Sequence, residues 1–238
     1  DLWPPSTPGA SRLRELLRAA ERDLGVDPAD VRILELGAGT AIPSLFAAQE
    51  LAGLICGTGQ EQQTAGSRDV EPERRRGAST RKRVYISDIL AYHNIRQLVL
   101  SASRHPRRDL VKVVPHTWGE GCSDGPGSFL ATECDGEKFH LLIVSDCIYN
   151  PEYQEALLDS ICHALAREGR AVVAFSLHGN TAPENVWAFF DRALARGLHA
   201  PEDARRTEDM EETMRRLGLH RQNMGSRFVV HVHELRWR

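Results

Sequence analysis

The stretch that most constrains the fold runs from Val31 to Ser44, with the sequence VRILELGAGTAIPS. Apolar residues at its start predict a short buried strand, and a Gly-x-Gly turn and a helix start follow at once. Glycine is needed in such a turn because a Cβ would clash where the backbone bends sharply or approaches a ligand. Strand, glycine turn and helix in this order are typical of an α/β fold that binds a nucleotide-like cofactor.

The details of the turn favour S-adenosylmethionine over NAD. A dinucleotide fingerprint has a third glycine three residues after Gly39, and this chain has Ile42 there. S-adenosylmethionine carries no phosphate, and the carboxylate of Glu35 suits its cationic amino-acid end. An NAD-dependent oxidoreductase is further disfavoured because we find no Tyr-x-x-x-Lys hydride-transfer site.

Length and charge exclude several classes of protein. The 238 residues, 41% of them hydrophobic and 26% charged, fit one globular domain with a sizeable core. A net charge of −3 gives no basic field that would recruit nucleic acid or an anionic membrane surface. Five cysteines without a Cys-x-x-Cys pair favour reduced thiols. We expect a cytoplasmic monomer, with the nucleus as the alternative location, and neither a membrane nor a nucleic-acid partner.

One segment interrupts the α/β pattern. Residues 57–82 are charged and contain almost no large aliphatic side chain, so they cannot bury enough apolar surface to fold. We interpret them as a disordered insertion, between the helix after the glycine turn and the second strand, within a single domain spanning residues 1–238. The arginine run at 74–76 is interpreted as a solvated tract rather than a nucleic-acid contact.

Apolar runs predict further strands at 84–87, 110–114, 139–145, 171–176 and 227–235, whereas residues 201–218 are interpreted as helical. Asp88 follows the second strand. Once the insertion is removed, its distance from Gly39 is typical of a ribose-binding acid, with a helix cap as the alternative. Trp118 follows the third strand, where it would either stack on an adenine ring or fill the core.

The end of the 139–145 strand is the second informative stretch, with the sequence SDCIYNP at 145–151. Asp146 and Tyr149 emerge at the carboxyl edge of the sheet, where ligands bind in open parallel sheets. Helix capping is the alternative to a ligand contact for Asp146. His231 and His233 are interpreted as part of a solvated strand face, and no metal site is expected.

Together these stretches resemble the seven-β-strand S-adenosylmethionine-dependent methyltransferases, and within them the non-histone protein lysine methyltransferases of methyltransferase family 16. Some fungal members of this group act on translation elongation factors, and some are described as nicotinamide N-methyltransferase-like. The resemblance rests on Leu2-Trp3, residues 34–45, residues 85–89, Trp118-Gly119 and residues 145–161, which carry the Asp-x-x-Tyr signature. Most relatives have glycine where this chain has Ala41.

The resemblance implies a fold, a cofactor and a reaction. The fold is α/β, a Rossmann-like doubly wound seven-stranded sheet, mostly parallel with one antiparallel strand near the C-terminus. The reaction is methylation of a lysine, or of the N-terminus, of a protein such as a translation factor. Alternatives are a small-molecule N-methyltransferase with a nicotinamide-like acceptor and a cofactor-binding scaffold without turnover. The residues implied to contact S-adenosylmethionine are Trp3, Gly37, Ala38, Gly39, Asp88, Trp118 and Ser145, beside the candidate Glu35. For the implied reaction we expect Asp146 and Tyr149 to orient the acceptor amine, with His178 as a secondary candidate lining the acceptor channel.

Overall fold

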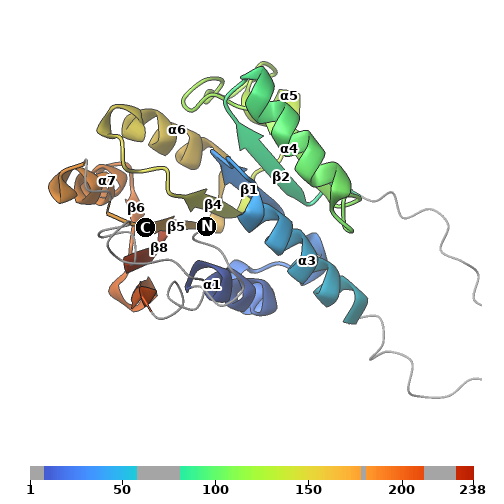
Figure 1. Cartoon of the computed structure of the whole chain (residues 1–238), viewed down its shortest axis with the longest axis horizontal. Helices are drawn as coiled ribbons and strands as arrows, with labels where there is room; N and C mark the ends of the chain where they lie inside the picture. Colours follow the sequence, from blue (N-terminus) through green and yellow to red (C-terminus); the bar gives the residue numbers. More distant parts are fainter. Residues whose placement is uncertain (1–7, 58–80, 178–180, 212–228) are drawn as a thin grey trace, which may run out of the picture.

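The centre of the molecule is a sheet with the strand order β3-β2-β1-β4-β5-β8-β6, with β7 also paired to β8 (Figure 1). The parallel strands are β1 (Ile33–Leu36), β2 (Val84–Asp88), β3 (Val111–Pro115), β4 (Phe139–Ser145) and β5 (Leu165–Phe175). β8 (Val229–Trp237) runs antiparallel to β5. These pairings confirm the predicted Rossmann-like α/β fold, with one antiparallel strand near the C-terminus.

The structure is a computed structural model that describes residues 8–57, 81–177, 181–211 and 229–238. Trp3, His178 and nearly all of the 57–82 insertion lie outside these residues. Among the helices that are described, none has the length and hydrophobicity needed to cross a membrane.

The sixth strand of the sheet is in two pieces. β6 (Leu198–His199) and β7 (Arg205–Asp209) both pair with β8, and the 3-10 turn η4 (Glu202–Ala204) separates them. The helix predicted over 201–218 is therefore wrong at 205–209, whereas residues beyond 211 lie outside the described ranges. This segment has no apolar face that would stabilise a helix by packing, while the backbone of β8 supplies it with hydrogen bonds as a strand.

Helices cover both faces of the sheet. One layer contains α1 (Pro8–Arg18), α2 (Ala20–Leu24), α3 (Ile42–Gly57) and α4 (Tyr92–Arg104). The other contains α5 (Phe129–Glu133), α6 (Gln154–Ala164) and α7 (Pro183–Ala195). In Figure 1, α1 and α3 lie on one side of the strands and α6 and α7 on the other. The 3-10 turns η1 (Pro28–Asp30) and η3 (Pro151–Tyr153) lead into β1 and α6.

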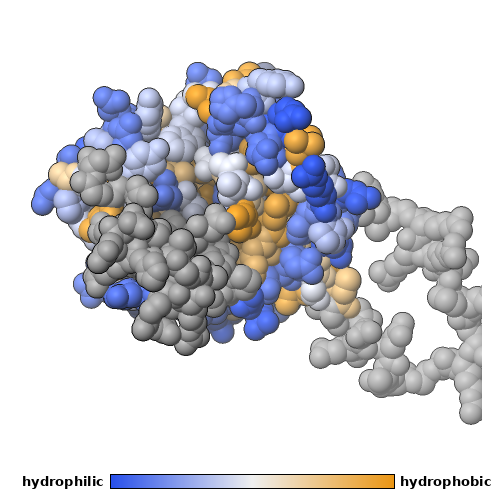
Figure 2. Space-filling model, in the orientation of Figure 1, coloured by the Kyte–Doolittle hydropathy of each residue, from blue (hydrophilic) through white to orange (hydrophobic). Residues whose placement is uncertain are grey.

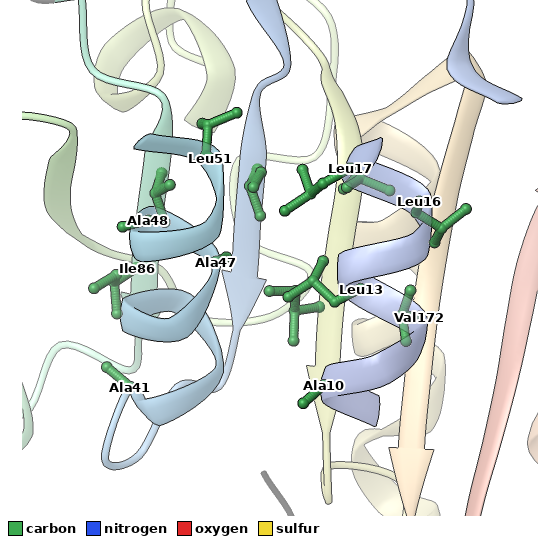
Figure 3. Packing of buried hydrophobic residues seen from close by; sticks show 14 of the residues in the cluster. Ala10, Leu13, Leu16, Leu17, Ala41, Ala47, Ala48, Leu51, Ile86 and Val172 are labelled. Atoms are coloured by element: carbon green, nitrogen blue, oxygen red, sulfur yellow. The ribbon is translucent and has the colours of Figure 1, made fainter. Parts of the chain in front are cut away.

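Successive residues of each strand face opposite helix layers, which gives the protein two hydrophobic cores. In β1, Ile33 faces α1 and α3, and Leu34 faces α5 and α6. Figure 3 shows α1 and α3 side by side on the sheet, with Leu13 and Leu17 of α1 among the buried side chains. α3 is apolar almost all the way round, and Figure 2 shows hydrophobic surface over it on a mainly hydrophilic face.

Two further elements differ from the prediction. The strand predicted at 171–176 begins earlier, at Leu165, which ends α6 at Ala164 and pairs with Phe139 ahead of an irregularity in the β4–β5 register. Between the strands predicted at 110–114 and 139–145, the structure adds the short helix α5, whose first turn is capped by the hydroxyl of Ser128, which accepts from the Ala131 N–H (3.1 Å). The first difference depends on pairing with a strand distant in sequence, and the second depends on a single capping hydrogen bond.

An arginine lies inside the second core. Arg32 is 2% exposed, and its guanidinium lies over the rings of Tyr85 (5.0 Å) and Phe139 (4.9 Å). Its Nη1 donates to the carboxylate of Glu137 (2.8 Å), and its Nη2 donates to the carbonyl of Cys134 (2.7 Å). This planar cation thus ties β1 to the loop that leads into β4.

Replacing Arg32 with alanine should lower the free energy of unfolding by about 3 kcal/mol, because it empties the space between two rings and removes the shorter of two hydrogen bonds to the Cys134 carbonyl. Urea unfolding followed by circular dichroism measures this. Arg22→Ala, at an exposed arginine whose guanidinium pairs with its neighbour Asp23, should leave the midpoint unchanged. Equal midpoints for the two variants would contradict the assigned role of Arg32.

Candidate functional site

A cleft of about 740 Å³ opens at the carboxyl ends of the central strands. Loops after β1, β2, β3 and β4 line it, which is where a doubly wound sheet binds its ligand. The predicted site residues that line it are Glu35, Gly37, Ala38, Gly39, Asp88, Trp118, Ser145, Asp146 and Tyr149. The tenth, Trp3, lies outside the described residues, as does the secondary candidate His178.

The glycine turn after β1 forms the floor of the cleft. Gly37, Gly39 and Ala41 all have positive φ angles (70°, 51° and 61°). A Cβ on Gly37 would lie 2.6 Å from Cζ2 of Trp118, so only glycine allows this contact between the turn and the indole. Ala41 adopts a backbone conformation that favours glycine, the residue that the family resemblance implies at this position.

Glu35 lies in the wall of the cleft with only 1% of its surface exposed. Its Oε2 accepts a hydrogen bond from the backbone N–H of Ser44 at the start of α3 (3.1 Å). Burial raises the pKa of this carboxyl group to about 8, so the group is mainly protonated at pH 7. A cation bound nearby would favour the ionised form.

Asp88, at the end of β2, connects the glycine turn to the start of α4. Its Oδ2 accepts from the N–H of Gly39 (2.8 Å), and its Oδ1 accepts from the N–H of Ile89 (2.8 Å) and from Asn94 (3.0 Å). The alternative of a helix cap is wrong, since Ala91 occupies the N-cap position of α4. Asp88 therefore fixes the turn while its carboxylate lines the cleft.

Trp118 lines the cleft and also packs against the second core, whereas its stacking on an adenine ring stays a prediction. Its loop is held on α6 by the buried hydroxyl of Ser160, which accepts from the Gly119 N–H and contacts Nε2 of His116 (both 2.9 Å). His116 stacks on Phe129, and burial lowers its pKa to about 4, so the ring is neutral at pH 7. Sequence reasoning missed His116 and Ser160, because neither forms part of a recognisable motif.

The loop after β4 brings the predicted acceptor residues to the cleft. Asp146 has a φ of 55°, and its N–H donates to the carbonyl of Ala174 in β5 (2.7 Å). Tyr149 is about half exposed. Cys147 points inward, with Sγ 3.3 Å from the Leu36 carbonyl. Burial raises the pKa of this thiol, so it is not poised as a nucleophile.

Other lining residues escaped the sequence analysis because they lie in the same loops, or in the first turns of α3 and α6, without standing out by type. They share a position beside the motif residues, and they are Thr40, Ile42, Pro43, Ile89, Thr117, Tyr153 and Ala156. Their positions in the chain were the only available signal.

The two histidines near the C-terminus do not form the solvated strand face that was expected. His231 and His233 pack against Phe175, Trp187 and Phe190, and His233 is only 6% exposed. The prediction failed because α7 covers this face of β8, which no local pattern indicates. Within the described ranges, no group of three metal-ligating side chains comes together.

Solved structures with related folds include the CcbJ methyltransferase of Streptomyces caelestis and the [4+2]-cyclase SpnF. CcbJ is 15% identical with a TM-score of 0.50, and the match covers all of both chains. SpnF is 12% identical with a TM-score of 0.55, covering 96% of this chain and 81% of that one. At such identities the likeness shows the fold alone, and a cyclase among these structures illustrates that this fold does not determine the reaction.

Two curated relatives share the name protein N-terminal and lysine N-methyltransferase EFM7. The protein of Candida glabrata is 30% identical over 172 residues, covering 70% of this chain and 53% of the relative. That of Candida albicans is 28% identical, covering 68% and 53%. The chain therefore spans about half the length of the curated relatives it matches.

The family model described as lysine methyltransferase matches residues 74–193, just over half of the chain. The matched part contains Asp88, Trp118, Asp146 and Tyr149, all of which line the cleft. The glycine turn lies before it. The match agrees with the family predicted from the sequence motifs, and this chain belongs to the lysine methyltransferase family.

Proposed function

We propose that this chain is an S-adenosylmethionine-dependent N-methyltransferase that modifies a lysine side chain or the N-terminal amine of a protein. The observation that carries the proposal is the position of Asp146 and Tyr149 in the same cleft as the glycine turn and Asp88. Family membership and the names of the two EFM7 relatives support the same reaction. A translation factor is the first acceptor to test, and the expected setting is a cytoplasmic or nuclear monomer.

The residues on one side of the cleft fit S-adenosylmethionine. The volume of about 740 Å³ is in the usual range for sites that bind small molecules and cofactors. No atom lies within 4 Å of the Cβ position at Gly39, so the turn leaves open space beside the cleft. Asp88 offers a carboxylate to hydroxyl groups, Trp118 an aromatic ring, and Glu35 an acid that responds to a nearby cation.

When bound, S-adenosylmethionine supplies a methyl group activated by a sulfonium. The remaining task for the protein is to hold a neutral amine in line with that methyl group. A lysine amine has an ordinary pKa of about 10.4, and loss of water in a partly apolar cleft favours its neutral form. We assign Asp146 the role of accepting a hydrogen bond from the amine N–H through its carboxylate, with the Tyr149 hydroxyl as a second polar contact.

The proposal is tested by incubating the purified chain with S-adenosylmethionine labelled in the methyl group and a cell lysate. We expect label in protein, and less of it when the lysate lysines and N-termini are blocked beforehand. Asp146→Asn should lower incorporation about a hundredfold because it removes the carboxylate that orients the amine. Asparagine is used because it tolerates a positive φ.

The matched control is Asp135→Asn, at another aspartate with positive φ (60°) that does not line the cleft. It should retain activity within about twofold, and both variants should bind S-adenosylhomocysteine as the unmodified chain does. Full turnover in Asp146→Asn would reject the role of Asp146. Cofactor binding without label in any protein would favour a scaffold or a small-molecule enzyme.

Gly37→Ala should weaken binding of S-adenosylhomocysteine at least about tenfold, since the new Cβ displaces the Trp118 indole from the cleft wall. Titration calorimetry measures this. Gly25→Ala is the control, because Gly25 has a similar φ (65°) but no atom within 4 Å of its Cβ position. Both variants should lose about 1–2 kcal/mol of stability from backbone strain. If both variants bound S-adenosylhomocysteine with the same affinity, the assignment of the Trp118 indole to the wall of the cofactor site would be contradicted.

Binding of S-adenosylmethionine should release protons near pH 7. The raised pKa of Glu35 keeps the carboxyl protonated in the free chain, and a bound cation lowers that pKa, so up to about one proton leaves. Calorimetry in phosphate and in Tris buffers separates this release from the binding enthalpy. The release should fall toward zero above about pH 9, where Glu35 is already ionised, and should be lost in Glu35→Gln. A release that persists in Glu35→Gln would reject the assignment.

A further inference from the structure

We propose that the surface beside the cleft binds a flexible, basic segment of a protein, with a large apolar side chain next to a cationic one. This deepens the proposed function, on which it rests for the identity of the occupant as the methyl acceptor. The surface, called here the docking rim, consists of Ile89, Leu90 and Tyr92 after β2 with Tyr149 and Tyr153 after β4.

The docking rim gathers most of the exposed large hydrophobic side chains of the described residues. Eight such side chains are exposed, and five of them belong to the rim, including Leu90 (72%) and Tyr92 (83%). The other three lie further along the helices, at Val99 of α4 and at Trp187 and Leu194 of α7. Exposed apolar side chains gathered at one place, beside a cleft, indicate a surface that binds another molecule.

The rim continues into a second, shallow hollow. This hollow, of about 230 Å³, is lined by Leu90, Pro115 and Phe129, and it shares His116 and Thr117 with the cleft. An extended chain whose amine enters the cleft can therefore lay a neighbouring side chain on Leu90 without leaving the surface. The apolar part of the hollow suits a side chain such as leucine.

Charge selects the occupant. The cleft is lined by the carboxyl groups of Asp88 and Asp146, beside the buried and mainly protonated one of Glu35, and the hollow adds those of Glu120 and Glu133. The described residues that line the two include no lysine or arginine, although the chain has 30 basic residues. Lys112 donates to the backbone carbonyl of Glu133 (2.6 Å) and lies over the ring of Tyr85 (5.9 Å), but it does not line the hollow. The complement of such a surface is a cationic segment.

The same charges disfavour other occupants. A nucleic acid would bring phosphates toward carboxylates, which repel them. A second copy of this chain would pair the surface with itself in a two-fold dimer, so the two sets of carboxylates would face each other. The tyrosines of the rim, by contrast, can contact the aliphatic stem or the charged group of an arginine or lysine.

The test measures binding of two fluorescent nine-residue peptides by anisotropy, with the full chain and saturating S-adenosylhomocysteine. Each peptide has one central lysine. One carries leucine and arginine on both sides of the lysine, and the other carries serine and aspartate at the same positions. We expect the basic apolar peptide to bind at least about tenfold more tightly in low salt, with an advantage that shrinks at about 300 mM salt. Failure of both peptides to bind at 1 mM, or equal affinities, would overturn the proposal.

Matched variants locate the binding. Leu90→Ser combined with Tyr92→Ser should weaken binding of the basic peptide about tenfold. Val99→Ser combined with Leu194→Ser, at two exposed side chains (49% and 41%) outside the rim, should change it less than twofold. Glu120→Gln combined with Glu133→Gln should reduce the salt dependence of the affinity for the basic peptide. Equal effects of the two serine pairs would reject the docking rim. The docking rim would also be rejected as a peptide site if sedimentation showed a dimer of the unmodified chain that is lost in the variant with both Leu90→Ser and Tyr92→Ser.

Methylation of the same peptides, measured in parallel, separates the two proposals. Rim-dependent binding without methyl transfer would support the docking rim and reject the proposed reaction on lysine. Methyl transfer that is unchanged in the Leu90 and Tyr92 variant would support the reaction and reject the docking rim.

Discussion

The pairing of β1 with β2 on one edge and β4 on the other is the constraint on which the site depends. After β1 the chain passes to the α3 layer, and after β4 it passes to the α6 layer, on the opposite face. Loops that leave a sheet in opposite directions from adjacent strands open a space between them. The glycine turn and the Asp146 loop line that space from the two sides, although they are more than a hundred residues apart.

Three carboxyl groups share the cleft, and the fold holds each in a different way. Glu35 is buried, so its charge depends on what lies nearby. Asp88 accepts three hydrogen bonds and stabilises the turn that it faces. Asp146 is presented by a strained backbone conformation, held by pairing of its N–H to β5. The same chemical group is thereby suited to sensing a cation, to fixing a turn and to meeting an acceptor.

Much of the arrangement of the strands and of the site residues could be predicted because it depends on patterns over a few neighbouring residues. The apolar run at 139–145 predicted β4 with the bounds that the structure has, and Asp88 and Asp146 were expected at strand ends because parallel strands bring their carboxyl ends to one edge. Prediction failed where pairing partners are distant. Residues 205–209 form a strand only because β8 lies beside them, and His233 is buried only because α7 covers it.

The sequence by itself determined the order of the five parallel strands, the α/β class and the residues that would meet at the carboxyl edge, because hydrophobic periodicity and turn chemistry act over a few residues. Only the tertiary structure decided the close contact of Gly37 with the Trp118 indole, the Ser160 bonds that hold the Trp118 loop, and the protonation of Glu35. These depend on distances and burial between segments far apart in the chain, and a linear pattern carries no information about either.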